Sequence, residues 1–414
     1  MYKPDEKTGV LVVDNFPRLG TLTAARFLEW VQRNPEGVVS LPTGKTPEFF
    51  IKETRRLIDG WDDPETRREI EALGLDPSEK PETAGLRFVQ IDEFYPINPR
   101  HQNSFYHYVQ KYYVDGFGLD PERGLFIRAD EIGIPEDDSL DSVWGEEGVD
   151  LSLRYRLPAT RHEELQQAVI REVDQWCVEY EDRIREFGGI GFFLGGIGPD
   201  GHIGFNVRGS DMHSTTRLTE INYETKAAAA SDLGGIEVAD KRLVITVGLE
   251  TITANPQAVA IIMAAGEAKA GVVADAVLHE RHVNYPATAL QGLKHARFYL
   301  TEGAAKHLTA RRVAALKAKD ELTEADVERV TFDVAVAAGK RLVDLEASDF
   351  KAHPEGKVLL TRESAKPSAI GADVARRLKT KVSAGMDLPT GTVFLHTEPH
   401  HDDIMHGYMP HVVR

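Results

Sequence analysis

The sequence predicts an α/β protein whose main domain has three layers, with helices on both faces of a mostly parallel sheet. Short β-rich runs alternate with longer helical patterns over about the first 300 residues, as repeated strand–helix units do. Several of the short runs are apolar throughout, which is typical of strands covered on both faces. The composition, 42% hydrophobic and 28% charged, is that of a globular protein.

Six runs are candidate strands of this sheet, and two long stretches between them have helical periodicity. The candidate strands are Val38–Leu41, Leu86–Ile91, Ile190–Leu194, Leu243–Val247, Val259–Met263 and Phe298–Leu300. The helical stretches are Thr21–Gln32 and Glu164–Phe187, the second of which stops at Gly188. The acidic, irregular stretch Pro135–Asp150 indicates a surface insertion.

Charge and cysteine content exclude several classes of protein. The 414 residues carry 49 Lys and Arg against 66 Asp and Glu, a net charge of −17, so we expect neither a nucleic-acid surface nor a membrane partner. The single cysteine, Cys177, excludes a disulfide framework and predicts core packing. We expect a cytoplasmic protein, because no signal peptide is visible and the longest apolar run, Ala258–Gly266, is far shorter than the ~20 residues of a membrane helix.

Changes in composition divide the chain into three parts. We expect a main domain over residues 1–310 and a helical linker over residues 311–350. A short C-terminal α/β fragment is expected over residues 351–414, with a strand at Thr392–His396.

The first loop that could bind a ligand is SLPTGKTP, which follows a candidate strand and opens a helix. Thr43, Gly44, Lys45 and Thr46 offer free backbone N–H groups, two hydroxyls and a close-approach glycine, a combination that binds anions. We expect Thr46 to be the N-cap, with Pro47 at the first helical position. An ordinary capped turn explains the same residues equally well.

The second loop places two carboxylates, Asp92 and Glu93, directly after an apolar strand. Parallel sheets display catalytic groups at this position. Desolvation in a partly dry cleft would raise the pKa of a carboxyl and make it a useful proton shuttle. The alternative is an acidic pair at a turn or helix start.

The third loop, GGIGPDGHIGFN, combines closely spaced glycines with an acid and a histidine. Gly196, Gly198 and Gly201 match the Gly-x-Gly-x-x-Gly dinucleotide pattern, but Pro199 stands where a smooth helix start should hold a pyrophosphate, so we reject that interpretation. A tight backbone turn that presents Asp200 and His202 as an acid–base pair fits better.

The fourth loop, AAGEAK, follows the most apolar strand and opens another helix. Lys269 stands in its first turn, where its side chain could reach a phosphate. A solvated first-turn lysine is the alternative.

Together these loops resemble the glucosamine-6-phosphate deaminase family. The matching segments, in family order over residues ~10–310, are LPTGKTP (41–47), IDEFY (91–95), GGIGPDGHIGFN (195–206), GEAK (266–269) and PATALQ (286–291). The related 6-phosphogluconolactonases share the Asp-Gly-His turn but typically continue with Thr-Ala-Ser. The resemblance implies a modified Rossmann-like sheet.

The resemblance also implies a reaction: aldose–ketose isomerisation with deamination of an amino-sugar phosphate, most simply glucosamine 6-phosphate to fructose 6-phosphate and ammonia. Asp92 would move the proton between carbons 1 and 2, and His202, oriented by Asp200, would assist ring opening. No cofactor is implied for the main domain, and family members are often homo-oligomers. The residues implied to hold the substrate and its phosphate are Thr43, Gly44, Lys45, Thr46, Glu93, Gly196, Gly198, Gly201 and Lys269.

The sequence departs from the family pattern at three places. Lys45 replaces a second glycine of the phosphate loop, and Val207 replaces a glutamate that completes the relay with Asp200 and His202. The phosphate-binding arginine expected after the third motif has no clear match, and Lys226 or Arg217 are the candidates to replace it.

The C-terminus carries a second, partial resemblance. The segment VFLHTEPHHDD is similar to the opening strand and motif of LmbE-like zinc N-deacetylases. His400 and Asp403 would bind zinc, Asp402 would be the base, and His401 replaces the usual proline. Zinc is implied only if this fragment belongs to a complete deacetylase domain, because a catalytic site needs a third ligand.

Two alternatives to the deaminase stay open. A lactonase-type hydrolase would use Asp200 and His202 to activate water and would need little from Asp92. A sugar-phosphate-binding sensor without catalysis is the second, suggested by Val207 and Lys45.

Overall fold

The computed structural model describes residues 5–145, 148–233, 235, 239, 241–362, 366–387 and 391. The chain divides into two compact units, one formed by Asp5–His307 and the other by the chain from Leu308 onward. Each unit has a hydrophobic core of its own.

The first unit is built on a seven-stranded sheet in which every neighbouring pair is parallel. The strands, in sheet order, are β1 (Gly9–Val13), β10 (His295–Thr301), β9 (Val259–Ala264), β6 (Phe192–Gly196), β2 (Val38–Ser40), β3 (Arg87–Val89) and β5 (Gly124–Leu125). The interior strand β9, VAIIMA, is buried at all six positions. The predicted α/β class with a mostly parallel sheet is confirmed.

A second, antiparallel sheet overturns part of the strand prediction. Residues 243–247 were expected in the main sheet, but they supply β8 (Leu243–Thr246), which pairs with β4 (Asp92–Tyr95) and β7 (Arg217–Thr219). An apolar run predicts a buried strand but not its partners, which is why the sequence misplaced it.

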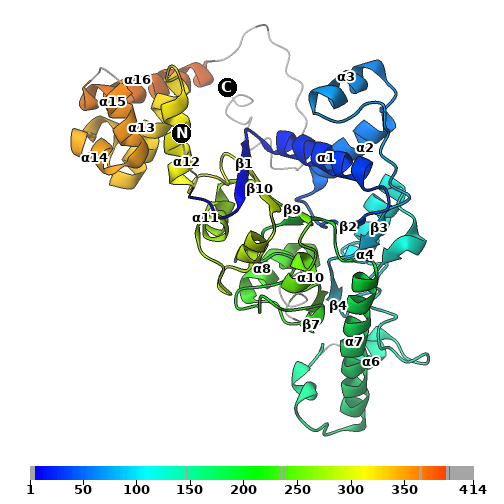
Figure 1. Ribbon diagram of the computed structural model, residues 1–414. Helices are drawn as coiled ribbons and strands as arrows, with labels where there is room; N and C mark the ends of the chain where they lie inside the picture. The colour runs from blue at the N-terminus through cyan, green and yellow to red at the C-terminus, as the bar shows by residue number, and fades with distance from the viewer. Residues whose placement is uncertain are drawn as a thin grey trace. The chain divides into compact units, whose positions relative to one another are not determined.

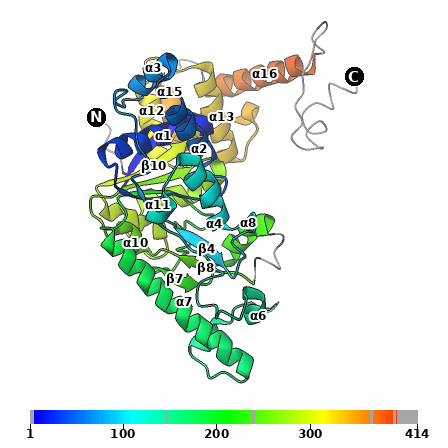
Figure 2. The same ribbon diagram turned by 90° about the vertical axis from the view of Figure 1, so that its right-hand side faces the viewer.

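Helices cover both faces of the main sheet, as predicted, with α1 and α2 on one side and α7, α10 and the antiparallel sheet on the other (Figures 1 and 2). The ring of Phe27 in α1 lies 5.5 Å from that of Phe50 in α2 and 5.3 Å from that of Phe192 in β6, which ties one helical layer to the sheet. Helices of this unit are α1 (Phe16–Arg33), α2 (Glu48–Asp59), α3 (Pro64–Ala72), α4 (Phe105–Val109), α5 (Asp115–Phe117), α6 (Leu140–Trp144), α7 (Arg161–Glu186), α8 (Tyr223–Leu233), α10 (Leu249–Thr253) and α11 (Ala270–Leu278).

The acidic stretch 135–150 is more than a surface insertion. It contains α6, whose Trp144 is 2% exposed and packs edge-on against Tyr95 of β4 at 6.0 Å between ring centroids. The acidic residues around Trp144 made the whole stretch look exposed, so the sequence did not predict that this tryptophan is buried.

Cys177, on α7, is buried as predicted.

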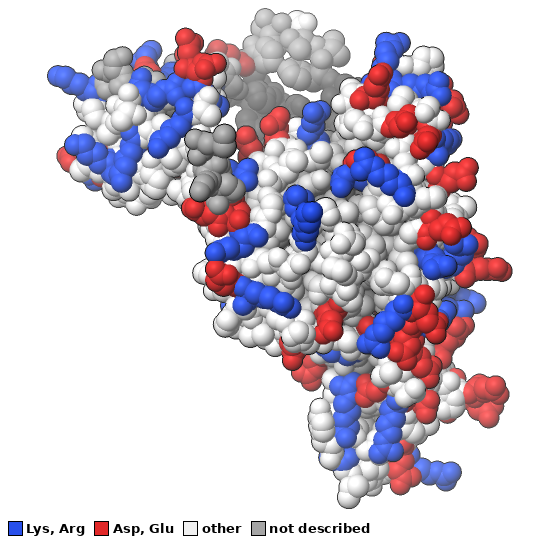
Figure 3. Space-filling view, in the orientation of Figure 1, with Lys and Arg blue, Asp and Glu red and all other residues white. Residues whose placement is uncertain are grey.

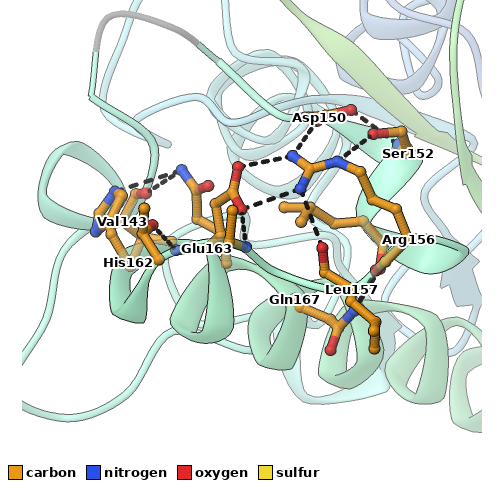
Figure 4. Close-up of polar contacts among 12 residues, drawn as sticks. Val143, Asp150, Ser152, Arg156, Leu157, His162, Glu163 and Gln167 are labelled. Carbon is orange, nitrogen blue, oxygen red and sulfur yellow. Dashed lines mark hydrogen bonds and ion pairs between the residues drawn. The ribbon is translucent and has the colours of Figure 1, made fainter.

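Beside this stretch, Arg156 ties the chain that precedes α7 to the first turn of that helix (Figure 4). Its guanidinium donates to Asp150 at 2.8 Å, to Glu163 at 2.8 and 3.0 Å and to the hydroxyl of Ser152 at 2.9 Å. This fixes the geometry of the α7 N-terminus.

The second unit is a helical bundle. Its helices are α12 (Thr309–Ala318), α13 (Glu324–Ala338), α14 (Ala347–Ala352), α15 (Pro354–Arg362) and α16 (Pro367–Met386). Phe350 of α14 and Leu359 of α15 share one core, so the expected boundary at residue 350 does not separate two parts here. The described part of the expected α/β fragment is helical, and the expected strand at 392–396 lies outside the described residues.

None of the helices among the described residues is long and apolar enough to cross a membrane. On the face of the first unit seen in Figure 3, Lys and Arg side chains are interspersed with Asp and Glu rather than gathered in one patch.

Candidate active site

A cavity of about 250 Å³ lies where several strands of the main sheet end. Thr43 and Thr46 follow β2, Gly196 ends β6 and Lys269 follows β9, so parallel strands bring these loops to one edge. We call it the smaller cavity. Its lining comprises Pro42, Thr43, Thr46, Ile91, Asp92, Phe105, Gly195, Gly196, Ile197, Gly198, His202, Gly204, Phe205 and Lys269.

A larger cavity of about 580 Å³ adjoins it. Four residues, Thr43, Phe105, His202 and Phe205, line both cavities and form their boundary. The phosphate-loop residues Gly44 and Lys45 line only the larger cavity, so the loop contributes to both spaces.

Two tyrosines hold the loop after β2. The hydroxyl of Tyr108 donates to the carbonyl of Gly44 at 2.9 Å, and that of Tyr113 donates to the carbonyl of Pro42. Gly44 has φ +86°, a backbone conformation that favours glycine. The expectation that Thr46 caps α2 is wrong: the helix begins at Glu48 after Pro47 and has no side-chain cap. Thr46 instead lines the smaller cavity.

Asp92 begins β4, opposite Thr246 of β8, and lines the smaller cavity. It is 7% exposed. Burial, followed by the negative charge of Glu93, raises the pKa of Asp92 well above its usual range. A carboxylate in this state is a stronger base than an ordinary aspartate.

Glu93 lines neither cavity, and its expected contact with the substrate stays a prediction. Neighbouring side chains of a strand point to opposite faces, and Glu93 points away from Asp92. Its carboxylate accepts from the hydroxyl of Ser104 at 2.6 Å and from the backbone N–H groups of Phe94, Phe105 and Tyr106 at 2.8–3.0 Å. Glu93 therefore secures the first turn of α4. Burial raises its pKa to about 7, although these donors oppose the rise.

The side chains of Asp200 and His202 are in contact, as the sequence indicated. Oδ1 of Asp200 lies 2.5 Å from Nδ1 of His202, and its Oδ2 accepts from the side-chain amide of Asn222 at 2.6 Å. Burial alone would raise the pKa of Asp200, but the hydrogen bonds and charge of His202, with those of Arg208 N–H and Asn222, lower it. With Nδ1 engaged by a carboxylate, Nε2 is the ring nitrogen left for a ligand.

The glycines of the third loop make room for this pair. A Cβ on Gly198 would lie 2.0 Å from Cε1 of His202, so any larger residue would displace the imidazole from this position. The N–H of Gly201, which has φ +88°, donates to the carbonyl of Gly198 at 3.1 Å and closes the turn. Gly196 and Gly198 line the smaller cavity, whereas Gly201 lines neither and shapes the loop instead.

Lys269 lines the smaller cavity from the turn that precedes α11. Burial lowers the pKa of its ammonium, and the nearby charge of Asp200 opposes that change. The two candidates for the missing arginine lie elsewhere: neither Arg217 nor Lys226 is among the lining residues. Arg217 donates to the side-chain oxygen of Asn206 at 2.9 Å, a structural contact.

Two residues that sequence reasoning missed complete the surroundings of His202. Asn222 holds Asp200, and the hydroxyl of Thr225 lies 3.3 Å from Nδ1 of His202. Asn222 also accepts from the N–H of Thr225 at 3.0 Å, which places it as the cap of α8. The Asn-x-x-Thr spacing at a helix start is the signal that could have found them.

The expected zinc ligands His400 and Asp403 lie outside the described residues, as do His401 and Asp402. Within the described ranges, no group of three or more His, Cys, Asp or Glu side chains could hold a metal ion.

Comparison with known proteins gives a consistent result. The chain is 27% identical over 286 residues to glucosamine-6-phosphate deaminase 2 of Bacillus subtilis (strain 168), a match that covers 69% of this chain and 92% of that protein. It is 25% identical over 282 residues to the glucosamine-6-phosphate deaminase of Bacillus pumilus (strain SAFR-032). That match covers 68% of this chain and 92% of that protein. This chain is similar to glucosamine-6-phosphate deaminases.

A solved structure agrees on the fold. It is that of a monomeric glucosamine-6-phosphate deaminase, described as a missing link of the NagB superfamily, with a TM-score of 0.53 and 21% identity over 72% of this chain and 99% of that one. No protein-family model matches the sequence.

Proposed function

We propose that the first unit is an enzyme that isomerises and deaminates an amino-sugar phosphate, with glucosamine 6-phosphate as substrate and fructose 6-phosphate and ammonia as products. The observation that carries the proposal is that Asp92, His202 and Lys269 line one cavity of about 250 Å³. A base, an acid–base imidazole and a cation are the groups that this reaction needs. The similarity to deaminases over 69% of the chain supports the same assignment.

Each group has a role in the proposed reaction. Asp92 takes the proton from carbon 2 of the open-chain sugar and returns it to carbon 1, a step that its raised pKa favours. His202, held by Asp200, exchanges a proton with the ring oxygen during ring opening. Lys269, the hydroxyls of Thr43 and Thr46 and backbone N–H groups hold the phosphate.

Atoms balance without a redox cofactor. Moving one proton from carbon 2 to carbon 1, and one from the amine nitrogen to the oxygen on carbon 1, converts the aldose amine into an imine at carbon 2. Water then adds to carbon 2, the nitrogen leaves as ammonia and the water oxygen becomes the carbonyl.

The test is a direct assay. The full-length chain is incubated with glucosamine 6-phosphate, and ammonia and fructose 6-phosphate are measured. We expect both products in equal amounts, and a fall of about a thousandfold in kcat for Asp92→Asn, since general acid–base groups contribute about 10²–10⁴-fold. Calorimetry with Asp92→Asn should still detect sugar-phosphate binding.

The two alternatives predict other outcomes of the same experiment. A lactonase hydrolyses 6-phosphogluconolactone and keeps most of its activity in Asp92→Asn. A sensor binds glucosamine 6-phosphate in the calorimeter without releasing ammonia. Either result would overturn the proposed deaminase. Homo-oligomerisation, a cytoplasmic location and the absence of nucleic-acid partners stay predictions.

A further inference from the structure

Beside the smaller cavity lies the larger one, most of which the proposed reaction does not use. We call the larger cavity the annex. Its boundary with the smaller cavity is formed by Thr43, Phe105, His202 and Phe205, which line both. A ligand whose reacting carbons lie beside Asp92 can therefore extend past His202 into the annex.

The volumes suggest that one sugar phosphate does not fill the site. Pockets for small-molecule ligands span about 300–1,000 Å³. The smaller cavity, at about 250 Å³, is below that range, whereas the annex, at about 580 Å³, is well inside it. The annex has room for a group as large as a second sugar ring.

Aromatic rings form much of the annex wall. The rings of Tyr108 and Tyr112 lie 4.5 Å apart, and those of Phe94 and Phe105 lie 5.0 Å apart, between centroids. The hydrogen bond from the hydroxyl of Tyr108 to the carbonyl of Gly44 holds the first pair against the phosphate loop. The apolar C–H face of a pyranose ring packs well against fixed aromatic rings of this kind.

The polar groups of the annex are mixed donors and acceptors. Gln102 and Asn103 contribute amides, and Lys52 and Glu48 form an ion pair at 2.5 Å. With Lys45 the lining holds two ammonium groups and one carboxylate besides His202, so no strong net charge selects a second phosphate. Amides and a paired charge suit the hydroxyl groups of a neutral ring.

We propose that the substrate is an amino-sugar phosphate that carries a second, neutral sugar ring, which the annex binds. This inference rests on the proposed function. The reaction uses carbons 1 and 2 and the amine, and the phosphate occupies oxygen 6, so the second ring is attached through oxygen 3 or oxygen 4. The chemistry is unchanged: water supplies the carbonyl oxygen, ammonia leaves and the second ring stays attached.

The first experiment compares three substrates with the full-length chain. These are glucosamine 6-phosphate and its 3-O- and 4-O-β-glucosyl derivatives, with ammonia release as readout. We expect kcat/KM for one of the two disaccharides to exceed that for glucosamine 6-phosphate by about tenfold, as added aromatic contacts can supply. If both disaccharides react no better than glucosamine 6-phosphate, the inference is wrong.

The second experiment removes one wall of the annex. Tyr112→Ala should lower the ratio of kcat/KM for the preferred disaccharide to that for glucosamine 6-phosphate by about tenfold, and Tyr112→Phe, which keeps the ring, should preserve the ratio. Thermal unfolding checks that both variants are folded. An unchanged ratio in folded Tyr112→Ala would count against the annex, whatever the absolute rates.

The outcomes separate the two proposals. Turnover of glucosamine 6-phosphate without a preference for either disaccharide leaves the proposed function intact and overturns the annex. If none of the three sugars releases ammonia, the proposed function fails, and calorimetry on the same ligands then decides the annex: tighter binding of a disaccharide supports it, and equal or weaker binding overturns it.

Discussion

The carboxylate of Asp200 holds the imidazole of His202 at 2.5 Å between Oδ1 and Nδ1, and Asn222 holds the same carboxylate from its other oxygen. This chain thus orients its histidine through an amide of the α8 cap. Val207 stands where the deaminase pattern has a glutamate, and the pair is contacted by the amide of Asn222, the hydroxyl of Thr225 and the N–H of Arg208.

Asn222→Ala tests this positioning role. Removing the amide takes away one hydrogen bond to Oδ2 of Asp200 and leaves the longer one from the N–H of Arg208, at 3.3 Å between N and Oδ2. Since a hydrogen bond to a charged group contributes about 1.5–3 kcal/mol, we expect kcat for glucosamine 6-phosphate to fall about tenfold or more, with little change in KM. Steady-state kinetics over a range of pH values measure the changes in kcat and KM. Tyr223→Ala, at the exposed neighbouring residue, is the control. A fall in Tm with kcat unchanged would show that Asn222 is only a helix cap.

Gly198→Ala should displace the imidazole of His202, the proposed acid–base group. The new Cβ would lie 2.0–2.3 Å from three atoms of the His202 ring, so the ring must shift from its present position. We expect kcat to fall about a hundredfold, in line with the loss of one acid–base group. Gly271→Ala, on the nearby helix α11, has nothing within 4 Å of its Cβ and is the matched control. Comparable kinetics in the two variants would contradict the role of His202.

Glu93→Gln should move the acid limb of the pH–rate profile to lower pH. Only the carboxylate form of Asp92 accepts a proton, so activity is lost as the pH falls through its pKa. Burial is the first cause of that raised pKa and the charge of Glu93 is the second. Removing the charge lowers the pKa of Asp92, and we expect the acid limb of kcat/KM against pH to move to lower pH.

The matched control for this shift is Glu93→Asp, which keeps the charge and should move the acid limb less than Glu93→Gln does. Both variants weaken the hydrogen bonds to the first turn of α4, so both should lower the Tm. A limb that stays in place in Glu93→Gln, or moves to higher pH, would show that Glu93 does not set the basicity of Asp92.

The convergence of the loops could be predicted because it follows from local pattern. Apolar runs marked β2, β6 and β9, and parallel strands end at a common edge, so Thr43, Gly196 and Lys269 had to lie near one another. The partners of β8 were not predictable in this way. They are set by the antiparallel register with β4 and β7, to which an apolar run gives no clue.

The contacts of individual side chains were the part of the site that the sequence predicted least well. The donors to Glu93 lie up to 13 residues further along the chain, and their arrival depends on where α4 begins. Asn222 lies 22 residues from Asp200, and its effect on the pair depends on the start of α8. Tertiary packing fixes such contacts, and one sequence carries no sign of them beyond a capping pattern.

Glu93, which accepts from the first N–H groups of α4, and Asp92, the proposed base, occupy consecutive positions of one strand. Fraying of the first turn of α4 would admit water to Glu93, solvate its charge and weaken its repulsion of the neighbouring carboxylate. The reactivity of the site is thereby tied to the integrity of a helix that contributes no acid or base of its own. Substitutions that loosen that helix should change the pH dependence of activity before they unfold the protein.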